Sequence, residues 1–194
     1  MPGDGDGGAP GFIVWVEGLP GAGKSTMARA LSQKLSAAGW KVEVLDGDEL
    51  RGTFFPELTF SRKDREAHAR RVSQFARILA RNGVVVIAAM ITPYETSRQT
   101  VRANVGSRFV EVWVRCPLEI CQRRDPKGIY SRRGQGSLQK VTGVDDPFEE
   151  PLSPDVIVDT ASTPVDRGVA QVLEYLDKKG LTGGRTVETV AYPF

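Results

Sequence analysis

The residues with the plainest chemical potential form one glycine-rich run near the N-terminus, Gly18-Leu-Pro-Gly-Ala-Gly-Lys-Ser-Thr26. Its spacing matches the pattern G-x-x-x-x-G-K-[ST] of a phosphate-binding loop. Glycines let the backbone wrap around phosphate oxygens with N–H groups pointing inward, and the following helix adds positive dipole. Lys24 would reach the β- and γ-phosphates, and the Ser25 hydroxyl would bind magnesium. The run predicts a site for ATP and Mg²⁺, whose nucleotide-binding residues are Gly18, Gly21, Ala22, Gly23, Lys24, Ser25 and Thr26.

Two carboxylates, Asp46 and Asp48, follow the next apolar run at 42–45. At the carboxyl edge of a parallel sheet they would face a nucleotide crevice. That placement suits a kinase, in which an acid orients an acceptor hydroxyl and helps to hold magnesium. The apolar run at 84–89 is not followed by the acid of a motor ATPase, and the Asn-Lys-x-Asp guanine reader of a GTPase is missing from the sequence. The alternative, an Asp-Gly-Asp turn that caps the following helix, is compatible with catalysis.

A basic, glycine-rich stretch lies between Arg123 and Gly143, with Asp125 as its single acid. A mobile basic segment near a phosphate site predicts a lid, placed here at 124–143, that excludes water and neutralises charge on the moving phosphoryl group. The alternative is a solvated basic loop that binds nothing. Aromatic residues are not interleaved with the charges as in a nucleic-acid surface, so we expect no nucleic-acid partner.

A second group of arginines surrounds an aromatic residue between 51 and 71. Guanidinium groups bind anions and an aromatic ring offers a stacking face, so the group suits a nucleotide with an anionic 5′ substituent. Each arginine taken singly also fits a helix surface. His68, the one histidine, fits a polar position on a helix better than a catalyst. The members of the group are Arg51, Phe60, Arg65, Arg70 and Arg71.

The elements that must position these residues alternate between strand and helix. Apolar runs predict strands at 12–16, 42–45, 84–89, 109–114 and 156–158, and helical periodicity predicts helices at 24–38, 61–82, 93–105, 118–124 and 165–178. Residues 51–61 are expected to form a loop, with Ser61 as the N-cap of the next helix. The alternation predicts an α/β, three-layer fold of the P-loop NTPase type, with a mostly parallel sheet of about five strands and helices on both faces.

The 194 residues fit one domain, expected at 12–179 between a flexible lead-in at 1–11 and a C-terminal tail at 180–194. The two cysteines, Cys116 and Cys121, have neither metal-site spacing nor a disulfide framework. The apolar runs are too short to span a membrane, and residues 1–11 lack the apolar region of a signal peptide. A net charge of +2 identifies no partner. We therefore expect a cytoplasmic protein without a membrane partner.

The sequence resembles the adenylylsulfate kinase family from about Phe12 to Thr160. The resemblance is carried by GLPGAGKST (18–26), LDGDELR (45–51), TFSRKDRE (59–66), ITPY (91–94), CQRRDPKGIY (121–130) and TGVDDPFEEP (142–151). It implies phosphorylation of the 3′-hydroxyl of adenosine 5′-phosphosulfate with Mg-ATP, for sulfate assimilation, by a protein that often dimerises.

The resemblance also implies roles for single residues. Asp48 would face the acceptor hydroxyl, with Asp46 supporting the metal shell together with Ser25, and Lys24 would complete the catalytic set. Arg124 and the lid would cover the ATP base. The acceptor nucleotide would be bound by Asp48, Arg51, Phe60, Arg65, His68, Ile91, Thr92, Gln139, Lys140 and Val141.

The departures from the family pattern fall on the acceptor side. His68 stands where the family usually has Asn, and 139–143 read Gln-Lys-Val-Thr-Gly where it usually has Lys-Gly-Phe-Thr-Gly. The missing Phe is the second ring around the acceptor adenine, so Val141 would weaken adenine binding or change the base accepted. One alternative is therefore a 3′-kinase for another 5′-modified nucleotide, such as cytidine diphosphoramidate. A further alternative is a nucleotide-binding regulatory subunit without turnover.

Overall fold

The computed structural model describes residues 10–136 and 140–185. Five strands form one sheet in the order β2-β3-β1-β4-β5, and every neighbouring pair is parallel. The sheet confirms the expected α/β architecture and strand number. The elements are β1 (Ile13–Glu17), α1 (Lys24–Ala37), β2 (Val42–Asp46), α2 (Gly47–Phe54), α3 (Arg62–Arg81), β3 (Val85–Met90), α4 (Glu95–Val105), β4 (Phe109–Arg115), α5 (Leu118–Arg124), α6 (Ile129–Gly134), β5 (Val156–Asp159) and α7 (Val165–Lys178).

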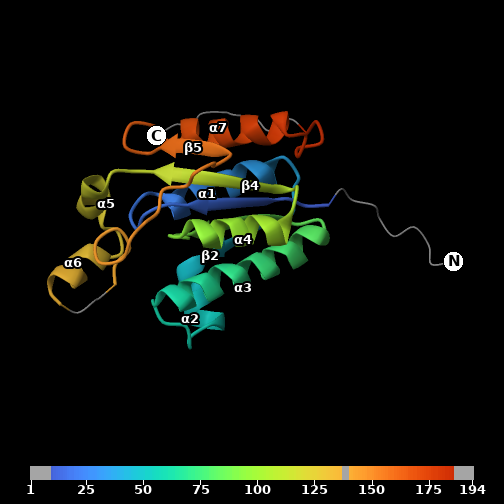
Figure 1. Ribbon diagram of the computed structural model, residues 1–194. Coiled ribbons are helices and arrows are strands. Elements are labelled where there is room, and N and C mark those ends of the chain that lie inside the picture. The colour runs from blue at the N-terminus through green and yellow to red at the C-terminus, as the bar shows by residue number, and fades with distance from the viewer. Residues whose placement is uncertain (1–9, 137–139, 186–194) are drawn as a thin grey trace.

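Helices cover both faces of the sheet, because successive side chains of each strand point to opposite sides. Val14 and Val16 of β1 pack with α1 and α7 on one face, whereas Ile13 and Trp15 pack with α3 and α4 on the other. Figure 1 shows α1 and α7 on one side of the strands and α3 and α4 on the opposite side. The central strands are buried on both faces, which explains their continuous apolar runs.

The expected loop at 51–61 is wrong for its first residues, because α2 extends to Phe54. The cause lies upstream of that segment. Asp46 is the N-cap of α2, and its Oδ1 accepts a hydrogen bond from the Asp48 N–H at 2.9 Å. The cap therefore starts a helix immediately after β2. The prediction of Ser61 as the N-cap of α3 is confirmed, since its Oγ accepts from the Asp64 N–H at 3.2 Å.

The segment expected to be a lid loop contains α6, a six-residue helix. The Asp125 carboxylate accepts hydrogen bonds from the backbone N–H groups of Tyr130 and Ser131, at 3.1 and 2.9 Å. These bonds occupy donors in the first turn of α6, so one acidic residue organises part of a stretch that was expected to be a mobile basic lid. Gln139 and the outer parts of the lead-in and tail lie outside the described residues. Across the described chain, each helix is too short or too polar to cross a membrane.

Candidate active site

The phosphate loop joins β1 to α1 at the carboxyl edge of the sheet. Gly18 has φ +149°, and a Cβ there would lie 2.4 Å from the Val114 carbonyl oxygen, so only glycine fits where the loop passes β4. The Lys24 Nζ donates to the Leu19 carbonyl at 2.8 Å, inside the loop. Burial lowers the pKa of Lys24 from 10.5 to about 8, against the opposing charge of Asp48. The loop thus holds an amine whose pKa lies only slightly above neutral pH.

The Ser25 hydroxyl and the Asp46 carboxylate lie side by side. Ser25 Oγ donates to Asp46 Oδ2 at 2.9 Å, linking the start of α1 to the end of β2. Burial opposes ionisation of Asp46, but hydrogen bonds and the Lys127 charge hold its pKa below the usual value. Hydroxyl and carboxylate oxygens are the ligands that magnesium prefers. The residues present therefore fit Mg²⁺ bound partly through substrate phosphates, and the described residues contain no larger cluster of acids, histidines and cysteines for a metal.

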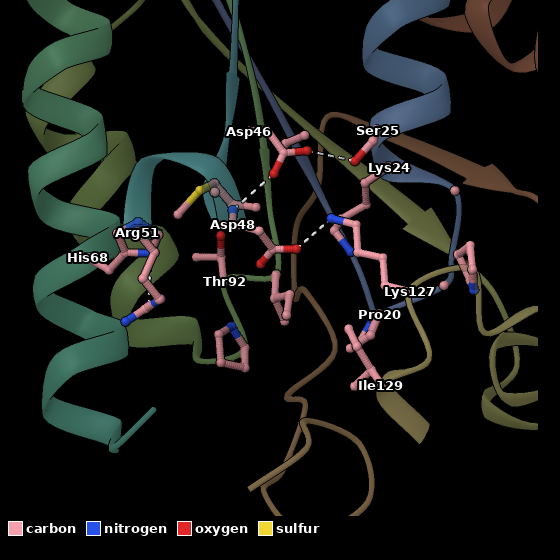
Figure 2. A pocket seen from close by; sticks show the side chains of 18 of the residues that line it. Pro20, Lys24, Ser25, Asp46, Asp48, Arg51, His68, Thr92, Lys127 and Ile129 are labelled. Carbon is pink, nitrogen blue, oxygen red and sulfur yellow. Dashed lines mark hydrogen bonds and ion pairs between the residues drawn. The ribbon is translucent and has the colours of Figure 1, made fainter. Parts of the chain in front are cut away.

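Asp48 faces a lysine that sequence reasoning placed in the lid without a site role. Lys127 Nζ lies 2.6 Å from Asp48 Oδ2, although the residues are 79 positions apart. Figure 2 shows both side chains projecting into the cavity between the phosphate loop and the end of β2. The Arg-Asp-Pro-Lys-Gly run was the signal that could have identified Lys127, since it places a cation at a fixed point of the basic stretch.

The acceptor side is built around two arginines. Arg51 donates to the Thr59 carbonyl at 2.7 Å and to His68 Nδ1 at 2.9 Å. Burial and the Arg51 charge lower the pKa of His68 from 6.5 to about 4, so the imidazole is neutral at pH 7 and accepts the bond at Nδ1. Arg65 donates to the carbonyls of Phe60 and Lys140, at 2.9 and 2.6 Å. His68 was expected to be a polar residue on a helix. In the structure it lies on α3, where its hydrogen bond orients Arg51.

Phe60 lies close to both arginines at the cavity wall. The guanidinium carbons of Arg51 and Arg65 lie 5.0 and 5.4 Å from its ring centroid, and the residue is 45% exposed. Both cations therefore lie near a ring that retains an accessible surface for a planar base. Ile91 and Thr92, which follow β3, line the same cavity.

One cavity of about 320 Å³ brings most of the expected site residues together. Its walls include residues of the phosphate loop, both aspartates and the arginine–aromatic group. A neighbouring cavity shares Asp48, Phe60 and Arg65 with it and adds Lys140 and Val141 from the lid segment. Expected site residues in the first cavity are Gly21, Gly23, Lys24, Ser25, Thr26, Asp46, Asp48, Arg51, Phe60, Arg65, His68, Ile91 and Thr92.

Arg124 lies apart from the walls of both cavities. Its Nη2 donates to the Thr160 carbonyl at 2.7 Å, next to a Thr160 hydroxyl that donates to the Ala22 carbonyl at 2.8 Å. Thr160, which sequence reasoning did not single out, thus connects Arg124 to the phosphate loop. The predicted role of Arg124 over the ATP base stays a prediction.

The parallel sheet, the phosphate loop and the acids at the end of β2 and the start of α2 define a P-loop kinase. The family model described as Adenylylsulphate kinase matches residues 10–159. The chain therefore belongs to the adenylylsulphate kinase family.

Individual relatives agree over most of their length. The adenylyl-sulfate kinase of Myxococcus xanthus is 49% identical over 174 residues, which is 88% of this chain and 94% of that protein. The corresponding enzyme of Paraburkholderia xenovorans is 44% identical over 176 residues, covering 91% and 98%. The APS kinase of Mycobacterium tuberculosis, solved in complex with AMPPNP and APS, superposes with a TM-score of 0.82 at 37% identity, covering 87% of this chain and 98% of that structure.

Proposed function

We propose that this chain is an ATP-dependent kinase that phosphorylates the 3′-hydroxyl of adenosine 5′-phosphosulfate. The observation that carries the proposal is a single cavity that joins two halves. Lys24 and Ser25 lie in one half, Arg51 and Phe60 lie in the other, and Asp48 lies between them. Relatives with the printed name adenylyl-sulfate kinase, and a similar structure that holds APS with an ATP analogue, support the same activity.

The reaction follows from the placement of charges. Lys24 offsets negative charge on the β- and γ-phosphates, and Lys127 adds a second cation from the lid side. Ser25 and Asp46 would hold magnesium together with the phosphates, and the ion would supply further neutralisation. Asp48 accepts a hydrogen bond from the acceptor 3′-hydroxyl and aligns its oxygen with the γ-phosphorus. The hydroxyl oxygen forms a bond to the γ-phosphorus and its proton passes to the Asp48 carboxylate. The bond from that phosphorus to the β–γ bridging oxygen breaks, and ADP leaves.

The acceptor half recognises both ends of a 5′-modified nucleotide. Arg51 and Arg65 supply guanidinium groups for the anionic 5′ substituent, and Phe60 supplies a ring face for the base. Val141 in the neighbouring cavity offers no second ring. This observation favours, as a second candidate, the same transfer to another 5′-modified nucleotide such as a cytidine diphosphate derivative.

A coupled ADP-release assay separates the candidates. The panel contains Mg-ATP with adenosine 5′-phosphosulfate, AMP, and cytidine, uridine and guanosine nucleotides that carry 5′ substituents. Fast turnover on adenosine 5′-phosphosulfate supports the first function, and turnover on another nucleotide alone supports the second. Lys24→Ala should abolish either activity. If the unaltered chain turns over no nucleotide, the kinase proposal fails and the regulatory alternative gains support.

The remaining expectations concern the setting of the protein. We infer a homodimer and a cytoplasmic location, and we place the kinase domain at 12–179 with 124–143 as its lid. Sedimentation at micromolar concentration tests the dimer, and limited proteolysis with and without nucleotide tests the lid. Protection of 124–143 by bound ATP would support closure, and unchanged cleavage would count against it.

A further inference from the structure

Thr92 adopts a backbone conformation that its surroundings must enforce. Its φ is +42°, in the left-handed region that non-glycine residues rarely occupy. The residue is β-branched, and Pro93 follows it, and both features disfavour this conformation further. Such residues persist where neighbouring structure over-determines them, and they concentrate at functional sites. Thr92 and its neighbours Ile91 and Pro93 all line the cavity of the candidate active site.

Two buried side chains from different elements donate hydrogen bonds to Thr92. Trp15 of β1 donates its Nε1–H to the Thr92 Oγ1 at 2.8 Å. Arg98 of α4 donates from Nη1 to the Thr92 carbonyl oxygen at 2.8 Å. All three residues are 3% exposed or less, so neither bond competes with bulk water. The hydroxyl oxygen and the carbonyl oxygen of Thr92 therefore each accept a hydrogen bond from a buried donor.

Arg98 is itself surrounded by acidic residues, of which Glu17 and Glu111 are buried. Its Nη2 donates to the Glu149 carbonyl at 2.8 Å, and its Nε donates to Glu95 at 3.0 Å. Glu17 and Glu111 approach the same Nε to 3.7 and 3.8 Å. Burial, and then the charge of Glu111, raise the pKa of Glu17 well above the usual value. The guanidinium is thus fixed on several sides and has little freedom to release the Thr92 carbonyl.

We propose that Trp15 and Arg98 are positioning residues that clamp Thr92 in its left-handed conformation and so fix Ile91–Pro93 as a wall of the acceptor half of the cavity. The assignment of this half to the acceptor rests on the proposed function. Ile91 also lines the neighbouring cavity with Lys140 and Val141, which places this wall on the acceptor side. The clamp acts through backbone geometry alone. Its loss should therefore affect acceptor binding much more than ATP binding.

Arg98→Lys tests the clamp, because lysine keeps the charge and cannot make the same set of planar hydrogen bonds. We expect KM for the acceptor to rise about tenfold or more, while KM for ATP stays within about twofold. Arg102→Lys is the matched control. Arg102 lies one turn further along α4 and pairs with Glu111 and Asp155 at 2.7 and 2.9 Å, but it does not line the cavity. Equal changes in both variants, or equal changes in both KM values, would overturn the proposal.

Thr92→Gly separates a clamp from a merely structural role. Glycine adopts positive φ without strain, so Arg98→Lys should change acceptor KM much less in the Thr92→Gly background than in the unaltered chain. The same pair is measured in urea unfolding, where the two substitutions should again be non-additive. Additive effects in that cycle would show that Arg98 does not act through Thr92.

The unfolding cycle also keeps this inference apart from the proposed function. It requires no substrate, so an unaltered chain that is inactive on adenosine 5′-phosphosulfate leaves the clamp testable. Thr92→Val with Trp15→Phe provides the second cycle. Valine keeps the shape of threonine and removes the acceptor of the Trp15 N–H, so Trp15→Phe should destabilise the Thr92→Val chain less than the unaltered one. Equal destabilisation in both backgrounds would remove Trp15 from the clamp.

Discussion

Lys127 and Asp48 meet across the mouth of the phosphate loop, with Nζ and Oδ2 2.6 Å apart. One residue follows α5 and the other lies in the first turn of α2, so the pair joins the lid segment to the end of β2. Both side chains are about half exposed, so the pair contributes little to folding stability. Its significance lies in chemistry, because it places a cation and a carboxylate together where the phosphoryl group would move.

Asp48→Asn should retain nucleotide binding and lose most of kcat. The amide cannot align and polarise the acceptor hydroxyl as a carboxylate does, and we expect a loss of about 100-fold or more. Titration calorimetry with AMPPNP measures binding, and initial rates measure kcat. Glu174→Gln is the control, since Glu174 pairs with Lys178 on α7 and neither residue lines the cavity. Unchanged kcat in Asp48→Asn would remove Asp48 from the mechanism.

Lys127→Met should lower kcat by about tenfold or more, since it removes a cation from the path of the phosphoryl group. The matched control is Lys178→Met, which breaks an exposed ion pair of 2.9 Å with Glu174 and should leave kcat unchanged. Steady-state kinetics at saturating ATP and acceptor provide the measurement. A Lys127→Met enzyme as fast as the control would show that the contact with Asp48 has no part in turnover.

ATP affinity should fall as the pH rises above about 8. Burial lowers the pKa of Lys24 to about 8, so much of the free protein carries a neutral amine above that pH. The triphosphate favours the ammonium form, and binding must then take up a proton. Calorimetry at pH 9 in two buffers with different ionisation enthalpies measures this uptake. Lys24→Arg stays charged and should show none of it. Binding without proton uptake by the unaltered chain would contradict the shifted pKa.

His68 should make folding stability depend on pH below about 6.5. Its pKa is about 4 in the folded protein, against 6.5 ordinarily, so the unfolded chain binds more protons between these values. Stability therefore falls as the pH drops through that window, by on the order of 3 kcal/mol in total. Urea unfolding at pH 7 and pH 4.5 measures the slope. His68→Asn can still accept from Arg51 and should lose this part of the slope; an identical slope in both chains would exclude His68 as its source.

Phe60→Ala should raise KM for the acceptor by roughly 5- to 150-fold, because base stacking on an aromatic ring contributes about 1–3 kcal/mol. KM for ATP should stay nearly constant. Phe75→Ala is the matched control, since Phe75 is 42% exposed against 45% for Phe60 but lies on α3 outside the cavity. Equal changes in the two variants would mean that Phe60 serves packing rather than recognition.

Local chemistry explains which elements were predictable from the sequence. The phosphate loop consists of nine contiguous residues, so its glycines and Lys24 lie close together whatever the rest of the fold. Central strands were recognised because burial on both faces demands unbroken apolar runs such as 84–89. Helix α2 was anticipated only as the helix that an Asp-Gly-Asp turn would cap, and its extension to Phe54 was missed because residues 51–61 were expected to form a loop. Helix α6 was missed because one turn organised by Asp125 leaves no apolar periodicity.

The sequence by itself determined the class of chemistry, since the residue types that bind phosphate and magnesium are adjacent in the chain. Only the tertiary structure decided how distant residues meet. Lys127 reaches Asp48 over 79 positions, and Trp15 reaches Thr92 over 77. The physical reason is that a parallel sheet carries the ends of strands far apart in sequence to one edge. Those contacts depend on strand order and register, which no local pattern of residues encodes.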